Sequence, residues 1–314
     1  MKLKLKKKVK IFLIGFLIGI FVLSYGINKY KEYRYHQTNE YKLTISGYTV
    51  EEAKKLEKNL SEENILNLIN KKKNENILKF IDEKYFLEKN LDRYNLYIEE
   101  NSDKSISDIV AIVNVGADKK WYEGIEETDM TKDTSILVNK FYSINNYAPE
   151  DLESISLSFA YSGHTIRKEV NEAYLDMANQ AKKEGIQLIV SSSYRSYEKQ
   201  ESIYKDFYYS KGETYADAYA ARAGHSEHQT GLALDIFTPN GTTTETFEKT
   251  EAYTWLINNA HKYGFILRYP KEKTYITGYE YESWHYRYLG RDLATKVYNE
   301  GITYDEYYAY YLDK

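Results

Sequence analysis

The sequence contains no cysteine among its 314 residues and only three prolines. Without thiols the chain can form no disulfide, and any transition metal must be held by histidine and carboxylate side chains. The formal net charge of -4 gives no basic excess of the kind that nucleic-acid-binding proteins carry, so we expect no nucleic acid partner. Tyrosine is abundant, at 35 residues, which genome base composition is enough to explain. The length leaves room for one substantial core and a smaller element.

The N-terminus resembles a membrane-targeting element. A lysine-rich segment, residues 1–10, precedes the uncharged apolar run Ile11–Ile27. A cleaved signal peptide has the same order but ends in small residues, whereas this run ends Leu23-Ser24-Tyr25-Gly26-Ile27. We therefore expect residues 11–27 to be an uncleaved transmembrane signal anchor, with secretion after signal cleavage as the alternative. The positive-inside rule then places residues 1–10 in the cytoplasm and the rest of the chain outside the cell membrane.

Residues 28–101 are predicted to form a helical stalk or a small helical module. From Gly47 to Asn101 the sequence contains no proline, and apolar residues recur at roughly helical intervals. Thr49-x-x-Glu52 matches a capping box, which marks the start of a helix. We find no catalytic set of residues in this segment.

Residues 102–314 are predicted to form one α+β domain with a largely antiparallel sheet, because strand and helix patterns alternate with few βαβ units. Short apolar runs predict strands, and apolar stripes at helical spacing predict helices. The predicted strands are 109–115, 188–190, 231–237 and 265–267. The predicted helices cover 170–181, 197–210, 214–221 and 255–263, with two more after Gly290 and Thr303.

Two segments far apart in the sequence carry the most informative residues, Gly224–Asp235 and Glu282–His285. Together they offer the inventory of a mononuclear zinc hydrolase: three protein ligands, an open position for water and a base. His228, Asp235, Glu282 and His285 are the candidates, and only three are needed as ligands. The residues by themselves leave open which of the four is the base. His225 is a competing ligand, three residues before His228.

The segment Gly231–Phe237 alternates in the manner of a half-buried strand. Leu232, Leu234 and Ile236 would face the core, which turns Asp235 to the opposite side among very small neighbours. A catalytic carboxylate needs that clearance. An ordinary strand with one exposed aspartate is the alternative.

Glu282 and His285 are three residues apart, which a regular strand would place on opposite faces. We therefore expect Glu282 in a turn or bulge that enters a strand beginning near Trp284. Arg195 follows the predicted strand at 188–190, where site residues gather, and a structural salt bridge is its alternative role.

The sequence resembles the zinc D-alanyl-D-alanine carboxypeptidases of the VanY-like family, within the superfamily of lysostaphin-like and hedgehog-like metallopeptidases. The family pattern S-x-H-x-x-G-x-A-x-D is filled at Ser226–Asp235, and E-x-W-H at Glu282–His285. The pattern S-x-Y-R-S-x-x-x-Q is filled at Ser192–Gln200. The resemblance covers roughly residues 90–300, and no essential position departs from the patterns.

The resemblance implies roles for individual residues. His228, Asp235 and His285 would bind Zn²⁺, which leaves Glu282 as the general base. Arg195 would polarise the scissile carbonyl. The candidate substrate-binding residues are Gln200 and Ser226, which would position the terminal carboxylate of the peptide, together with Ser193 and Trp284. The substrate implied is a peptidoglycan stem peptide with a C-terminal D-alanine; no protein partner is inferred.

Three other functions compete with this one. A serine carboxypeptidase needs S-x-x-K, which occurs at Ser196–Lys199 and again at Ser202–Lys205, but no K-T-G follows. An inactive, zinc-stabilised cell-wall binding module would need neither Glu282 nor Arg195. L,D-carboxypeptidase or endopeptidase action on the same peptides would use the same residues, and the sequence does not separate these from D,D-carboxypeptidase action.

Overall fold

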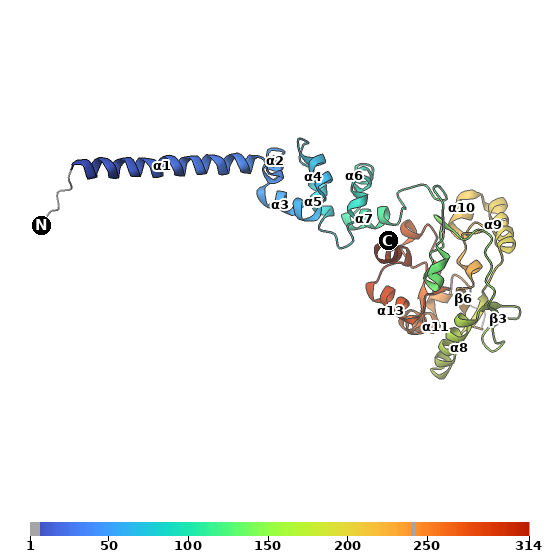
Figure 1. Cartoon of the computed structure of the whole chain (residues 1–314). Helices are drawn as coiled ribbons and strands as arrows, with labels where there is room; N and C mark the ends of the chain where they lie inside the picture. Colours follow the sequence, from blue (N-terminus) through green and yellow to red (C-terminus); the bar gives the residue numbers. More distant parts are fainter. Residues whose placement is uncertain (1–6, 240–242, 314) are drawn as a thin grey trace. The chain divides into compact units, whose positions relative to one another are not determined.

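The computed structural model describes residues 7–239 and 243–313 (Figure 1). Residues 1–6 of the predicted cytoplasmic segment lie outside the described residues. The chain divides into two compact units, with the boundary after Glu99.

The first helix, α1 (Lys7–His36), is longer than the apolar run that predicts it. Within its portion from Val9 to His36, an 18-residue window reaches a mean hydropathy of 2.2, and none of that window is buried. By length and composition this helix could cross a membrane, and a signal sequence has the same properties.

Short helices follow in the first unit: α2 (Asn39–Ile45), α3 (Val50–Asn59), α4 (Glu62–Leu68), α5 (Glu75–Phe80), η1 (Glu88–Asn90) and α6 (Leu91–Glu100). The predicted capping box is present, because the Thr49 hydroxyl accepts from the Glu52 N–H and the Glu52 carboxylate accepts from the Thr49 N–H. The Ser61 hydroxyl caps α4 by accepting from the Asn64 N–H. The helices enclose a small apolar core that includes Leu43, Leu56 and Ile77. The helices predicted between Gly47 and Asn101 are therefore confirmed.

The second unit is built on a four-stranded sheet with the order β5-β6-β8-β7. Its strands are β5 (Ile189–Ser192), β6 (Ala233–Phe237), β7 (Phe265–Leu267) and β8 (His285–Tyr288). Every neighbouring pair in this sheet is antiparallel, which confirms the predicted α+β fold with a largely antiparallel sheet. Two-stranded pairs lie beside it: β1 (Glu126–Glu127) parallel to β2 (Tyr142–Ser143), and β3 (Leu152–Ser154) antiparallel to β4 (Thr165–Arg167).

The second unit also contains many helices (Figure 1). They are α7 (Ile106–Asn114), η2 (Met130–Ser135), α8 (Lys168–Lys183), α9 (Tyr197–Lys211), α10 (Glu213–Tyr219), η3 (Glu227–Thr230), η4 (Phe247–Lys249), α11 (Glu251–Asn259), η5 (Ala260–Tyr263), α12 (Thr274–Thr277), α13 (Arg291–Glu300), α14 (Tyr304–Tyr307) and η6 (Tyr308–Leu312). The buried stripe of α8, which includes Tyr174 and Met177, packs with Leu234 and Ile236 of β6 in one apolar core. This core fixes the back of the sheet, so the opposite side of β6 is free to carry a site.

One predicted strand is wrong. The run at 109–115 forms most of α7, whose N-terminus is capped by the Ser105 hydroxyl accepting from the Asp108 N–H. Residues 109–113 are buried at every position, so the run shows neither the alternation of a half-exposed strand nor a one-sided helical stripe. The cap at Ser105 is the local feature that favours the helix.

Candidate metal centre and active site

The pairing of β6 with β8 brings the two informative segments together. Asp235 lies opposite His285 in the register of these strands. Leu232, Leu234 and Ile236 are fully buried on the core side, as the alternation predicts. Glu282 lies in the turn before β8, also as predicted, with its N–H donating to the Tyr269 carbonyl at 3.1 Å.

A left-handed glycine joins His228 to the strand. His228 lies in η3, which ends at Gly231 with φ of 68°, and β6 begins two residues later. A Cβ atom at position 231 would lie 2.8 Å from Cγ of Arg167 and 3.2 Å from Cγ of Pro149. Both the backbone angle and the close packing therefore favour glycine here.

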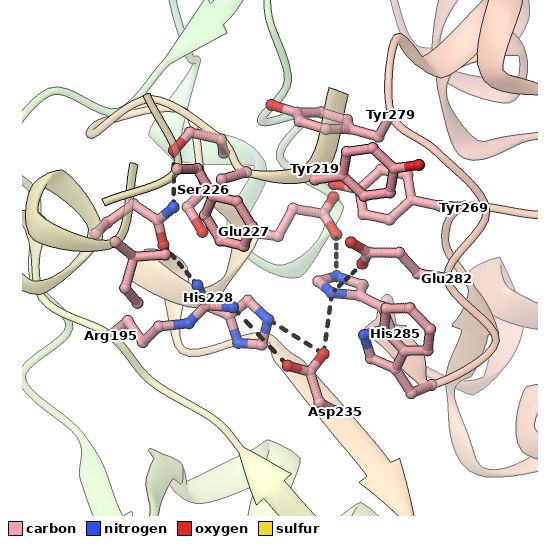
Figure 2. A pocket seen from close by; sticks show the side chains of 16 residues that line it. Arg195, Tyr219, Ser226, Glu227, His228, Asp235, Tyr269, Tyr279, Glu282 and His285 are labelled. Atoms are coloured by element: carbon pink, nitrogen blue, oxygen red, sulfur yellow. Dashed lines mark hydrogen bonds and ion pairs between the residues drawn. The ribbon is translucent and has the colours of Figure 1, made fainter. Parts of the chain in front are cut away.

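Three side chains could hold a metal ion. One donor atom each from His228, Asp235 and His285 lies within 4.8 Å of the others, and the three side chains point toward one another (Figure 2). Oδ1 of Asp235 is 3.3 Å from Nε2 of His228 and 3.3 Å from Nδ1 of His285. Within the described residues, neither Nε2 of His228 nor Oδ1 of Asp235 has a hydrogen-bond partner, although both atoms are buried. Buried polar atoms are costly when unpaired, so a cation between these donors would satisfy them.

The protonation of the two imidazoles differs. Nδ1 of His228 lies 2.8 Å from the Ser193 carbonyl, which can only accept, so Nδ1 carries the proton and Nε2 keeps its lone pair. Burial lowers the pKa of His228 to about 4. Burial also acts to lower the pKa of His285, but its contacts with Asp235 and Glu227 outweigh this and raise the pKa to about 9. Despite its own burial, Asp235 has a pKa held well below the ordinary value by the two imidazoles.

Glu282 is placed to exchange a proton beside these donors. Its Oε2 lies 3.5 Å from Nδ1 of His285. Burial raises the pKa of Glu282 to about 7, against the opposing charge of His285. A carboxyl group with a pKa near neutrality can both accept and return a proton at physiological pH.

Arg195 follows β5 and reaches the same pocket. Its Nη1 donates to Oε1 of Gln200 at 2.7 Å, while Nε2 of Gln200 donates to the Ala221 carbonyl at 2.7 Å. The nearest carboxylate oxygen, Oδ2 of Asp235, is 3.9 Å from Nη2 of Arg195. This distance is long for a structural salt bridge, so the guanidinium is held mainly by Gln200.

A pocket of about 200 Å³ contains these groups. It is lined by all four candidates of the metal site and by Arg195, Gln200, Ser226 and Trp284. The Ser193 hydroxyl does not line it and lies 3.1 Å from Nδ1 of His164, while the Ser193 carbonyl supports His228. His225 is turned away from the donors, with Nδ1 2.8 Å from the Asn139 carbonyl.

Sequence reasoning missed several residues that line the pocket. Tyr219, Tyr269 and Tyr279 form part of its wall (Figure 2). In a chain with 35 tyrosines their identity carries no signal, because only the fold selects these three. Glu227 was also missed, although it immediately precedes His228; Arg268 and Arg287, which contact it, come from distant segments.

Comparison with known proteins agrees with this geometry. Residues 163–291 match the VanY family, described as D-alanyl-D-alanine carboxypeptidase. The chain is 42% identical over 198 residues to the YodJ protein of Bacillus subtilis (strain 168), whose assigned name is that of a carboxypeptidase; the match covers 61% of this chain and 72% of YodJ. It is 38% identical over 191 residues to a D-alanyl-D-alanine carboxypeptidase of Enterococcus faecalis (strain ATCC 700802 / V583), covering 58% of this chain and 68% of that one.

A solved structure shares the fold. The LdcB LD-carboxypeptidase, whose structure was described in terms of peptidoglycan recognition, superposes with a TM-score of 0.56 at 42% identity, covering 61% of this chain and 92% of that one. The matched residues 163–291 include every residue that lines the pocket. The chain therefore belongs to the VanY family and is a metallocarboxypeptidase.

Proposed function

We propose that this enzyme removes a C-terminal D-alanine from peptidoglycan stem peptides, using zinc bound by His228, Asp235 and His285. The observation that carries the proposal is the convergence of these three donors, two of them without a hydrogen-bond partner in the described part of the chain, beside the carboxyl of Glu282. Zinc is the cofactor, and the donor set fits it: catalytic zinc takes three protein ligands from imidazole and carboxylate groups and keeps one position open.

Bound zinc supplies electrophilic chemistry, because it lowers the pKa of a water molecule to about 7. Glu282 accepts the proton of the attacking water and returns it to the leaving amine, a role supported by its carboxyl group lining the pocket beside the proposed ligands. Arg195 stabilises the negative charge that develops on the scissile carbonyl, since its guanidinium lines the pocket and is oriented by Gln200. Ser226 and Gln200 help to position the terminal carboxylate, and Trp284 forms part of the wall.

The second candidate function is L,D-carboxypeptidase action on a shortened stem peptide. It is favoured by the 42% identity and the shared fold with the LdcB LD-carboxypeptidase. D,D-carboxypeptidase action is favoured by the name of the Enterococcus faecalis relative and by the family that residues 163–291 match. Both reactions would use the same proposed catalytic residues.

We also infer that α1 anchors the enzyme in the cell membrane. On this proposal residues 1–10 are cytoplasmic, residues 28–101 form a stalk or helical module, and residues 102–314 form the catalytic domain on the outer side. The supporting observation is the exposed apolar helix that extends to His36. This location would place the enzyme beside its substrate.

The deciding experiment compares two peptides. Purified protein beginning at Glu40, loaded with zinc, is incubated separately with a pentapeptide stem ending in D-alanyl-D-alanine and with the corresponding tetrapeptide, and the products are weighed by mass spectrometry. Loss of one alanine from the pentapeptide, abolished by a chelator, supports the D,D-activity. Cleavage of the tetrapeptide alone would assign the L,D-activity, and cleavage of neither would overturn both.

A further inference from the structure

Behind His285 lies a carboxylate that the proposed chemistry does not use. The side chain of Glu227 is fully buried. Nε of Arg268 and Nη1 of Arg287 both donate to its Oε1, each at 2.7 Å. Two guanidinium groups therefore share one carboxylate oxygen, and they hold the carboxyl group ionised and fixed in orientation.

The second oxygen of Glu227 faces the metal site. Its Oε2 lies 3.4 Å from Nε2 of His285. The other ring nitrogen of His285, Nδ1, faces Asp235 and Glu282 at 3.3 and 3.5 Å. Figure 2 shows the His285 ring between Glu227 on one side and Asp235 on the other.

We propose that Glu227 is a positioning residue: it accepts the Nε2–H of His285 and thereby keeps the lone pair on Nδ1 directed at zinc. This inference rests on the proposed zinc site. A carboxylate partner at the far nitrogen fixes the tautomer and orientation of a ligating imidazole and increases its basicity. His228 receives its support from a neutral backbone carbonyl, that of Ser193, so the two imidazoles differ in the charge of their partners.

The arginine pair determines what happens when the carboxylate becomes an amide. In Glu227→Gln, the amide oxygen must take the position of Oε1, because Arg268 and Arg287 can only donate. The amide NH₂ then takes the position of Oε2 and points a donor at Nε2 of His285. The ring can accept this hydrogen bond only by moving its proton to Nδ1, which removes the lone pair from the metal side. We therefore expect zinc affinity to fall by roughly 10- to 100-fold, the usual effect of losing such a partner.

Asp305 provides a matched control. Its carboxylate pairs with the other side of Arg268, with Oδ2 2.5 Å from Nη1, and it is also buried. Asp305→Asn removes one negative charge from the same cluster of two arginines and two acids. Within the described residues, however, Asp305 forms no hydrogen bond or ion pair with His285. A merely structural role of Glu227 would make the two variants behave alike.

The test measures zinc affinity by competition with a chromogenic chelator, alongside the free energy of unfolding in denaturant. We expect both variants to lose stability, and only Glu227→Gln to lose zinc affinity and to recover activity at raised zinc concentration. Equal affinity of Glu227→Gln and the wild type would overturn the inference while leaving the zinc site intact. Absence of zinc binding in the wild type would instead overturn the proposed function.

A second measurement uses only the wild-type protein, so it does not depend on whether a variant folds. In zinc-loaded wild-type protein with ¹⁵N-labelled histidine, the NMR spectrum should show the His285 ring protonated at Nε2, with that proton protected from exchange. A ring protonated at Nδ1 would contradict the proposed orientation.

Discussion

The pKa of Glu282 depends on whether a metal ion is bound between His228, Asp235 and His285. Burial raises its pKa to about 7, and the nearby charge of Asp235 adds to this. A divalent cation between His228, Asp235 and His285 would lower that pKa, because it adds positive charge at short range. The side chain is therefore suited to take a proton when the metal is bound and to give it up to a leaving amine.

Replacement of Glu282 by glutamine separates the base from the ligands. Glu282→Gln keeps the size and polarity of the side chain but cannot accept a proton. We expect zinc to remain bound with one ion per chain while kcat falls by roughly 10² to 10⁴. Metal analysis and steady-state kinetics on the same sample measure both; loss of the metal would show that Glu282 is a ligand.

The stability of the metal-free protein should decrease as the pH rises from 7 to 8. The folded pKa of His285 is about 9, against about 6.5 for an unfolded histidine. In this interval the folded ring holds a proton that the unfolded ring has lost, so raising the pH lowers the free energy of unfolding, by about 1 kcal/mol. The interval ends at pH 8 because burial lowers the pKa of Lys140 to about 8. Its proton loss in the folded state is half complete at that pH and opposes the decrease more strongly as the pH rises further.

Denaturant titrations at the two pH values measure this change. Zinc-saturated protein is the control, because a ligating imidazole is already neutral and the decrease should disappear. A metal-free protein that gains stability between pH 7 and 8 would contradict the charged state assigned to His285.

At the scale of elements, the site depends on one turn between η3 and β6. Gly231 separates His228 from Asp235, and its carbonyl accepts from the Arg167 N–H at 3.3 Å. The turn therefore sets the distance between two of the proposed ligands and also ties them to β4.

Gly231→Ala should disturb both stability and metal binding. The added Cβ would meet Arg167 at 2.8 Å, and alanine at φ of 68° is strained. We expect a loss of about 2 kcal/mol in the free energy of unfolding and a measurable fall in zinc affinity. The control is Gly185→Ala, which also has positive φ, 85°, but has no atom within 4 Å of the added Cβ. It should lose about 1 kcal/mol with unchanged zinc affinity; equal behaviour of the two variants would contradict this account of the turn.

Elements whose pattern is local could be predicted from the sequence. The alternation at 231–237, the capping box at Thr49 and the helix after Thr303 are present as expected, because each depends on residues a few positions apart. The prediction at 109–115 failed because burial on every side removes the periodicity on which it relied.

The residues of the candidate site also fall into those that a local pattern predicts and those that it does not. The three donors and Glu282 fall within short patterns, and the fold brings them together. Tyr269 and Tyr279 in the wall, and the arginines behind Glu227, depend on pairings between distant segments. No local pattern in the sequence could select them.

At the scale of the whole molecule, the exposed apolar helix α1 belongs to the first compact unit, and the pocket belongs to the second. Every residue to which we assign a role in catalysis or zinc binding lies beyond Glu99. The first unit has an apolar core of its own.

Removal of α1 should therefore leave the chemistry intact. Protein beginning at Glu40 should be recovered from the soluble fraction and should cleave free stem peptides with kcat and KM close to those of the full chain. The full chain should fractionate with membranes and retain Met1 or Lys2 in its intact mass. A mature protein beginning just beyond Tyr25 would show that the segment is a removed signal, and the anchor would have to be abandoned while the chemistry stood.

The buried charges behind the pocket bear on when the enzyme first becomes active. Asp305 at the start of α14 neutralises Arg268, which in turn holds Glu227. On the proposed topology the chain crosses the membrane from its N-terminal side, so His228 and His285 emerge before Asp305. A partly exported chain would then display every proposed zinc ligand while an arginine behind them lacked a counter-charge. On this topology, wall cleavage would wait until Asp305 has been exported, without a separate inhibitor.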